Sequence, residues 1–402
     1  MTKKKQKLRF ASLFSGCGGL DLGFLQAGFE CVAAFDNDRD AIAAYKKNIG
    51  LHIHETDLKT AEPNHISELI SSADVLVAGP PCQGFSTAGK NDPNDSRNSL
   101  LLKVAEIVDF ARPAVVIIEN VRGLVSPRFK SYWNLLLSTL AESGYNVSYR
   151  LVEATEFGLP QTRRRIILAG VLAPVPLSLN FPSVKKNTLR DVLANIKECN
   201  QHSTRSLTPT GDAFNIAAHI GPGCKLSNVR GGQLSVHTWD IPNVFGKTTK
   251  QERELLERLI SLRRKIRRRK TGDADPVSLP DLSESMGYSV IEILERLIVK
   301  GYIRKLGEYY DLTHAFNGKF RRLQWKEPAP TVDTRFGQPR YFLHPDENRG
   351  FTIREAARIQ GFPDDFCFEG SGNAAYRLIG NAVPPPMAKS IAEIVRTHLV
   401  GI

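Results

Sequence analysis

The chain has 402 residues, enough for one large domain or two, and 42% of them are hydrophobic, as in proteins with an extensive core. Its net charge of +12 at pH 7 suits a polyanionic partner, although basic surfaces are often only solvated. No segment has the apolar length of a membrane span or the pattern of a signal peptide, so we expect no membrane partner.

The six cysteines are scattered along the chain without the C-x-x-C spacing that is typical of zinc sites. They are Cys17, Cys31, Cys82, Cys199, Cys224 and Cys367. Nothing in their spacing indicates a disulfide framework either. We therefore expect free thiols, no bound metal and a reducing cytoplasm.

Residues 9–171 alternate short apolar runs with segments of helical periodicity. The runs that predict strands are 9–14, 31–36, 74–80, 114–120 and 164–170, and the helical segments are 20–28, 39–48, 99–111 and 132–144. Continuous apolar strands that alternate with helices are typical of an α/β fold, in which helices cover both faces of a mostly parallel sheet. In such sheets ligands bind beyond the carboxyl ends of the strands.

The pattern breaks after about residue 172 and becomes compact again from Phe351. A very basic helix is predicted over 251–270. Over 278–313 the pattern predicts two short helices that meet at Gly287, followed by a two-strand wing. This order is typical of a winged helix-turn-helix, and a plain helical hairpin with a β-ribbon is the alternative.

The first predicted strand leads into a glycine-rich turn, FSGCGG. Gly16, Gly18 and Gly19 permit a tight turn and a close approach of the backbone to a ligand. Asp21 stands where a dinucleotide-binding turn has its third glycine, so a nucleoside without a pyrophosphate fits better. The next strand ends in Asp36, which is placed to hold a ribose.

Two strand ends carry side chains that are suited to chemistry. Cys82 follows the prolines of VLVAGPPCQGFS, and a cysteine attacks as its thiolate, which a helix start or a nearby cation favours. A buried structural thiol is the alternative. Glu119 follows four β-branched residues in VVIIEN, where burial of a carboxylate is costly unless it has a partner or a function. It is a candidate proton donor, and a surface acid that caps a helix is the alternative.

The segment QTRRR places Gln161, Arg163 and Arg165 at alternate positions. Alternate positions of a strand share one face, so we expect two fixed cations there for a phosphate or a carbonyl oxygen.

The motifs FSGCGG, PPCQGFS, ENV, QTRRR, REAARIQGFP and RLIGNAVPP occur in this order along the chain. Together they resemble the cytosine-carbon-5 DNA methyltransferases of bacterial restriction-modification systems, over most of the chain except roughly 172–330. The resemblance implies a Rossmann-like methyltransferase domain over 1–172, completed by about 371–402. It also implies a smaller target-recognition domain over 173–370, with the winged-helix-like insert at about 250–313.

The resemblance also implies a role for each catalytic residue. Cys82 would attack carbon 6 of cytosine, and Glu119 would hydrogen-bond the ring nitrogen 3 and the amino group. Arg165 would bind the base carbonyl, while Arg163 would support the phosphate and the catalytic loop. The implied contacts of the methyl donor, S-adenosyl-L-methionine, are Phe14, Gly16, Cys17, Gly18, Gly19, Asp36, Asn37, Asp57, Leu58, Pro80, Leu100, Asn381 and Val383. The expected DNA contacts are Ser86, Gln161 and the phosphate-binding Arg263, Arg264, Arg267 and Arg268.

The expected partner is double-stranded DNA with the target cytosine flipped out, because a stacked base cannot reach a thiol. We further expect a monomer in the bacterial cytoplasm, bound to the nucleoid, with a cognate restriction endonuclease acting separately. Three alternatives stay open: a transfer-RNA methyltransferase, a DNA-binding regulator with an inert methyltransferase half, and a small-molecule thiol enzyme. The helix-turn-helix-like region favours duplex DNA, and intact Cys82, Glu119 and Arg165 argue against an inert domain.

Overall fold

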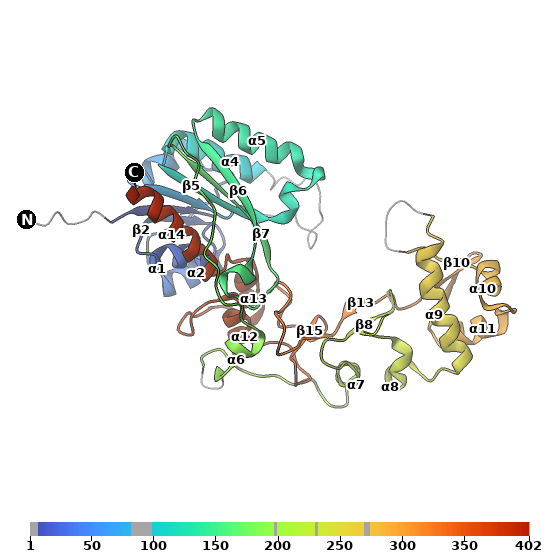
Figure 1. Ribbon diagram of the computed structural model, residues 1–402. Helices are drawn as coiled ribbons and strands as arrows, with labels where there is room; N and C mark the ends of the chain where they lie inside the picture. Colours follow the sequence, from blue (N-terminus) through green and yellow to red (C-terminus); the bar gives the residue numbers. More distant parts are fainter. Residues whose placement is uncertain (1–6, 82–98, 197–198, 230–231, 269–273, 402) are drawn as a thin grey trace, which may run out of the picture. The chain divides into compact units, whose positions relative to one another are not determined.

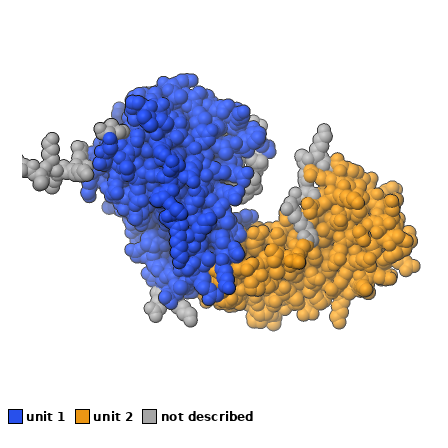
Figure 2. Space-filling model, in the orientation of Figure 1, with its two compact units in different colours: residues 1–202, 326–335, 353–402 blue, residues 203–325, 336–352 orange. Residues whose placement is uncertain are grey.

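The computed structural model describes residues 7–81, 99–196, 199–229, 232–268 and 274–401. The chain forms two compact units, coloured separately in Figure 2. Unit 1 comprises Met1–His202, Lys326–Arg335 and Ile353–Ile402, and unit 2 comprises Ser203–Trp325 and Phe336–Thr352. These boundaries differ from the predicted domains, because residues 173–202, 326–335 and 353–370 belong to unit 1.

Unit 1 is built on a seven-stranded sheet of order β3-β2-β1-β4-β5-β7-β6 (Figure 1). Its strands are β1 (Arg9–Leu13), β2 (Glu30–Asp36), β3 (Ile53–Glu55), β4 (Val75–Ala78), β5 (Val115–Val121), β6 (Asn146–Glu153) and β7 (Arg164–Val171). The first five strands are mutually parallel, whereas β7 runs antiparallel to both β5 and β6. The link from β6 to β7, which holds the 3₁₀ turn η4 (Ala154–Phe157), is too short for a parallel crossover.

Helices cover both faces of this sheet. The helices of unit 1 are α1 (Gly19–Gln26), α2 (Arg39–Asn48), α3 (Pro63–Leu69), α4 (Ser99–Ala111), α5 (Lys130–Glu142), α6 (Leu189–Leu193), α12 (Ile353–Gln360), α13 (Gly372–Asn381) and α14 (Pro385–Gly401). One core lies under α3, α4 and α5, and the other under α1 and α14. Val116 and Ile118 of β5 enter the first core, while Val115 and Ile117 enter the second, which explains the unbroken apolar run.

The C-terminal helix α14 packs against α1, the first helix of the chain. A Cβ atom on Gly23 of α1 would lie 2.4 Å from the Cβ of Ala388, so only glycine allows this approach. The two helices share the core of Phe24, Met387 and Ile391. The last helix thus covers the same face of the sheet as α1.

Buried arginine contacts explain why the late segments belong to unit 1. Arg354 of α12 is fully buried, and its guanidinium donates to the carbonyl oxygens of Asn200, Pro363 and Phe366. The amide of Thr162 donates to the carbonyl of Ala329 at 2.9 Å. The segments on either side of 336–352 are therefore tied to the α/β unit.

Unit 2 contains small sheets and a helical insert with its own core. Its first elements are α7 (Asp212–His219), β8 (Lys225–Ser227), β9 (Ser235–Val236), η6 (Thr238–Asp240) and α8 (Pro242–Phe245). The insert holds α9 (Lys250–Lys265), β10 (Val277–Ser278), α10 (Leu279–Met286), α11 (Ile291–Val299), β11 (Ile303–Leu306) and β12 (Tyr309–Leu312). The unit ends with β13 (Asn317–Lys319), β14 (Arg321–Arg322) and β15 (Phe342–Leu343).

The insert has the predicted winged-helix order, with two corrections. The wing has three strands, with β12 in the centre and β10 and β11 paired to its two sides. The basic helix ends at Lys265 and not at residue 270, and the amide of Arg268 donates to the Asp275 carboxylate 2.6 Å away. Gly287 adopts φ +77° between α10 and α11, as the turn requires.

Candidate active site

The carboxyl ends of β1, β2, β4 and β5 meet at one edge of the sheet. Strand β7 starts at this edge because it runs in the opposite direction, and Val121 of β5 pairs with Arg165 there. Cys82 and Ser86 follow β4 but lie outside the described residues. The other predicted catalytic side chains can be placed around this edge.

Glu119 and Arg165 form a close ion pair at the sheet edge. The Nε atom of Arg165 lies 2.8 Å from Oε1 of Glu119, and the two side chains are 13% and 10% exposed. Within the described residues the same Oε1 accepts no hydrogen bond, because the N–H of Arg165 does not point at this oxygen, so charge attraction holds the pair. A buried carboxylate oxygen with unused acceptor capacity is a natural contact for a ligand N–H group.

Asn120, which the prediction did not assign a role, fixes the start of the loop that carries Cys82. Its side-chain amide donates to the carbonyl oxygen of Pro80 at 3.3 Å, and its own oxygen accepts the amide of Val121 at 2.8 Å. Asn120 is 1% exposed. The signal was present in the sequence, since Asn120 is the middle residue of the ENV motif.

The glycine-rich turn has one position open to a ligand. Phe14 and Gly16 both adopt positive φ, at 56° and 58°, and the Gly16 amide donates to Asp36 at 2.7 Å. A Cβ on Gly16 would meet nothing within 4 Å, whereas a Cβ on Gly18 would strike Ile49 and one on Gly19 would strike the Val383 carbonyl. Gly16 therefore faces open space, and the other two glycines serve close packing.

A buried hydrogen-bond network supports this turn from below. Asp21 is fully buried and accepts from Ser12 Oγ at 2.6 Å and from Tyr45 Oη at 2.7 Å. Tyr45 Oη also lies 3.0 Å from His52 Nε2. Tyr45 has a single hydroxyl proton and donates it to Asp21, so His52 must be the donor in the second bond. The network links β1, α1 and α2, the elements that flank the turn.

We expect this network to make stability depend on pH in an unusual direction. Burial raises the pKa of Asp21 from 3.8 to about 6, although the bonds from Ser12 and Tyr45 oppose the shift. The native state then binds a proton that the unfolded state has released, so Asp21 lowers the free energy of unfolding as pH rises from about 4 to about 6. Two pKa units correspond to about 3 kcal/mol.

Urea unfolding of the wild type and Asp21→Asn at several pH values measures this effect. The free energy of unfolding of the wild type, relative to the variant, should rise as pH falls from 6.5 to 4. Glu30→Gln, which removes an exposed carboxylate from β2, serves as the control. A constant difference between wild type and Asp21→Asn over this range would show that Asp21 does not titrate there.

Comparison with known proteins decides the family. Residues 8–396 match the family described as C-5 cytosine-specific DNA methylase. The Type II methyltransferase M.BanI of Aneurinibacillus aneurinilyticus is 30% identical over 96% of this chain and 95% of its own length. The Type II methyltransferase M.NgoBV of Neisseria gonorrhoeae is 31% identical over 96% and 98%. The chain belongs to the C-5 cytosine-specific DNA methylases.

Solved structures agree with this methylase in fold. A putative DNA modification methyltransferase encoded within an E. coli prophage superposes with a TM-score of 0.59 at 22% identity, covering 98% of this chain and all of the other. The Dnmt2 methyltransferase of S. pombe gives a TM-score of 0.53 at 16% identity, covering 98% and 99%. The α/β methyltransferase fold and the cytosine-5 methyltransferase activity predicted from the motifs are thus confirmed.

The other predicted cofactor residues of the methylase fall into two groups. Asn37, Asp57 and Asn381 are exposed at the ends of β2, β3 and α13, where their side chains are accessible to a ligand. The side chains of the second group, Cys17, Leu58, Pro80, Leu100 and Val383, are buried. Burial raises the pKa of the Cys17 thiol to about 12, and that thiol lies 3.8 Å from the Leu378 carbonyl. The Cys17 side chain therefore faces the protein interior.

Gln161 and Arg163 do not form the predicted anion-binding face with Arg165. Gln161 is fully buried and donates to Gln360 and to the Ile359 carbonyl. Arg163 is 1% exposed and donates to the carbonyl oxygens of Val332, Gly380 and Ala382. Both precede β7, which begins at Arg164, so the assumed strand alternation does not apply to them. They hold the late segments of the methylase to its sheet, and their prediction as a DNA contact and a phosphate support was wrong.

Among the arginines predicted to bind phosphates, Arg263 and Arg268 have internal partners. Arg263 is 6% exposed, and its Nε lies 2.6 Å from Oδ1 of Asp311, so its prediction as a phosphate contact was wrong. Arg268 stacks on the ring of Tyr309 at 4.2 Å and donates to the Pro276 carbonyl. Arg264 and Arg267 are exposed beside it. The dense run is thus only partly a surface feature of the methylase.

The described part of the methylase offers no cluster of three or more His, Cys, Asp or Glu side chains able to hold a metal ion. Among the same residues, none of the helices combines the length and the apolar character needed to cross a bilayer.

Proposed function

We propose that Cys82, Glu119 and Arg165 form the catalytic group of this methylase, and that its substrate is a cytosine turned out of duplex DNA. The observation that carries the proposal is the ion pair of Glu119 and Arg165 at the end of β5. Strand β4 lies beside β5 in parallel register, and Cys82 follows its last residue by four positions. A stacked base cannot reach such a buried edge, so the base must leave the helix.

Each member of this group has a distinct part in the reaction. The Cys82 thiolate adds to carbon 6, and the displaced electron pair makes carbon 5 nucleophilic. Glu119 gives a proton to ring nitrogen 3, takes it back when the aromatic ring is restored, and accepts from the amino group. The guanidinium of Arg165 binds the carbonyl oxygen and stabilises the charge on the ring. After methylation, carbon 5 loses its proton and the bond from carbon 6 to sulfur breaks, which returns the thiolate.

S-adenosyl-L-methionine would supply the methyl group as an electrophile. The residues present fit such a nucleoside, because the space beside Gly16 is open and no third glycine or P-loop lysine is present for a pyrophosphate. Asp36 would hold the ribose, Asp57 the adenine amino group, and Asn381 would close the site from α13. Burial raises the pKa of Asp36, while its bond from the Gly16 amide and the charge of Arg377 oppose the shift.

Unit 2 would read the DNA sequence around the target base. The names of the relatives, Type II methyltransferases, support a role in a restriction-modification system, with a separate endonuclease as the functional counterpart.

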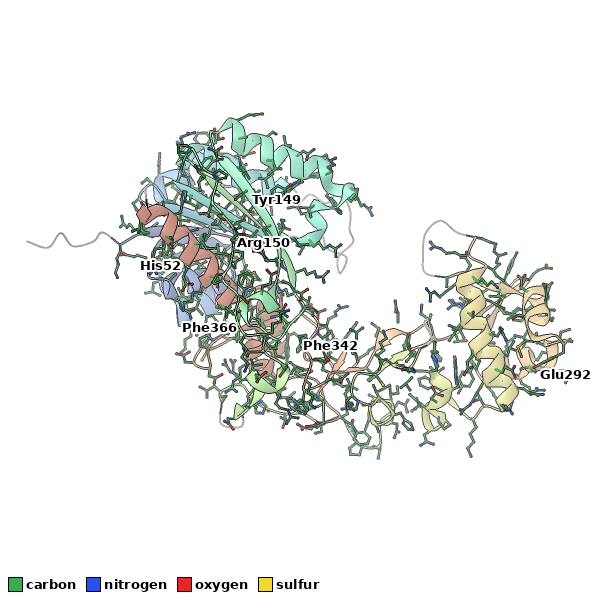
Figure 3. The ribbon with its side chains drawn as sticks, in the orientation of Figure 1. His52, Tyr149, Arg150, Glu292, Phe342 and Phe366 are labelled. Atoms are coloured by element: carbon green, nitrogen blue, oxygen red, sulfur yellow. The ribbon has the colours of Figure 1, made fainter. Side chains whose placement is uncertain are left out.

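In the insert, α11 presents Glu292 at its outer surface, as Figure 3 shows, and this side chain is 90% exposed. An acidic helix is a poor major-groove reader, so the insert would contact phosphates through Arg264 and Arg267. We further propose a monomer in the bacterial cytoplasm, bound to the nucleoid.

Methyl transfer to defined nucleic acids tests this function. The purified protein is incubated with labelled S-adenosyl-L-methionine and either duplex DNA of mixed sequence or transfer RNA. Label should enter carbon 5 of cytosine in duplex DNA at a fixed sequence. Label that enters only transfer RNA would overturn the duplex assignment, and label in neither would favour a regulator with an inert catalytic unit.

A further inference from the structure

We infer that the connection between β5 and α5 binds phosphates of the substrate duplex beside the target cytosine, through Arg122, Arg128 and Lys130. This connection comprises η2 (Arg122–Val125) and η3 (Pro127–Phe129) and leads directly into α5. The inference rests on the proposed function, because it assigns a partner to the residues next to the catalytic pair.

The connection carries positive charges, and the sequence around it has no acidic residue to balance them. Residues 120–141 contain three cations and no Asp or Glu. All three cations are exposed, and within the described parts of the chain none of them forms an ion pair. Some surface cations elsewhere in the same unit have carboxylate partners, for example Arg39 with Glu55 and Arg164 with Glu153. The charge of the connection is therefore available to an external anion.

The fold holds these cations in place. Leu124 and Phe129 are 1% and 0% exposed, and both enter the core under α4 and α5. The turn η2 also packs against η3, α5 and β7. Two buried anchors thus alternate with three exposed cations over nine residues, so the cations project from a rigid base. Little conformational entropy would be lost when they bind a phosphate.

The positive charges of the connection destabilise the amino end of α5. Lys130 is the first residue of α5 and Arg128 precedes it by two, so both lie at the positive end of the helix dipole. The N-cap residue, Phe129, provides no side-chain hydrogen bond to the first amides of the helix. Folding alone would favour Asp, Ser or Thr at this end. A bound phosphate would offset the repulsion of the cations.

The connection lies where the DNA backbone is expected to pass. Arg122 follows Val121, which pairs with Arg165 in the sheet, and it lies three residues beyond Glu119. A cytosine that contacts Glu119 and Arg165 stays covalently attached to its sugar and phosphates. The backbone next to the flipped nucleotide must therefore pass close to the end of β5. Phosphate contacts at this point would position the duplex without reading its sequence.

The triple variant Arg122→Gln, Arg128→Gln and Lys130→Gln tests the inference by its salt dependence. The log-log slope of duplex affinity against salt should flatten by about 0.9 for each phosphate that the variant no longer neutralises. At about 0.15 M salt this corresponds to roughly fivefold weaker binding per phosphate. The KM for DNA should rise, while kcat at saturating DNA, the affinity for S-adenosyl-L-methionine and the methylated sequence should stay unchanged.

A second triple variant with the same charge change is the control. Lys7, Lys46 and Lys47 lie before β1 and in the last turn of α2, at the amino edge of the sheet, and all three are exposed. Equal salt slopes in the two variants would overturn the inference. If the first variant does not fold, Arg122→Gln alone should still flatten the slope by about 0.9. A wild type that binds duplex DNA but does not methylate it would reject the proposed function and leave the slope test valid.

Discussion

Replacement of Cys82 by serine is expected to abolish methyl transfer while both ligands still bind. A serine hydroxyl is scarcely ionised at neutral pH, whereas a thiol forms its thiolate readily, and only the anion attacks carbon 6. Removal of the nucleophile from an enzyme that works through a covalent intermediate can cost on the order of 10⁶ in kcat. The measurement is single-turnover transfer of labelled methyl groups to duplex DNA, together with the dissociation constants of DNA and S-adenosyl-L-methionine.

A trapping experiment separates loss of the nucleophile from loss of structure. DNA that contains 5-fluorocytosine at the target position cannot lose a proton from carbon 5, so the wild type should remain covalently attached through Cys82 after denaturation. The Cys82→Ser variant should form no such adduct. Near-normal turnover by the variant, or the absence of an adduct with the wild type, would contradict the covalent mechanism.

The α/β unit could be predicted from the sequence because its central strands are buried on both faces. Strand β5 reads VVIIENV, and its apolar positions serve two cores at once. Strand β6, at the edge of the sheet, was not predicted. Its residues Tyr149 and Leu151 are 54% and 43% exposed, while Ser148 and Arg150 donate to the carbonyls of Leu177 and Leu179. A strand with polar partners on one side and solvent on the other lacks a clear period.

The candidate site was predictable where a side chain ends a strand and unpredictable where it meets a distant segment. Asp36 and Glu119 lie at the predicted sheet edge. By contrast, Arg163 donates to Gly380, which is 217 positions away along the chain. The cation-rich run 263–270 shows the same limit, because the partner of Arg263 is Asp311 in the wing. Local spacing indicates which side chains share a face but not which distant group will neutralise them.

Removal of either charge from the Glu119 and Arg165 pair is expected to lower kcat by about 10²- to 10⁴-fold. Glu119→Gln keeps the shape of the side chain but cannot give a proton to ring nitrogen 3. Arg165→Gln removes the cation that binds the carbonyl oxygen and leaves Glu119 buried without its partner, which also costs stability. The measurement is kcat under saturating DNA and methyl donor, with thermal unfolding of each variant.

Arg164→Gln is the matched control, because Arg164 is the neighbouring residue and forms an ion pair of the same length, 2.8 Å, with Glu153. The Arg164 side chain is 55% exposed against 13% for Arg165, so its pair should contribute little to stability and nothing to the reaction. The double variant Glu119→Gln, Arg165→Gln has no unpaired buried charge. We expect it to recover thermal stability relative to Arg165→Gln while kcat remains low. Recovery of kcat along with stability would show that the pair supports the fold and takes no part in the chemistry.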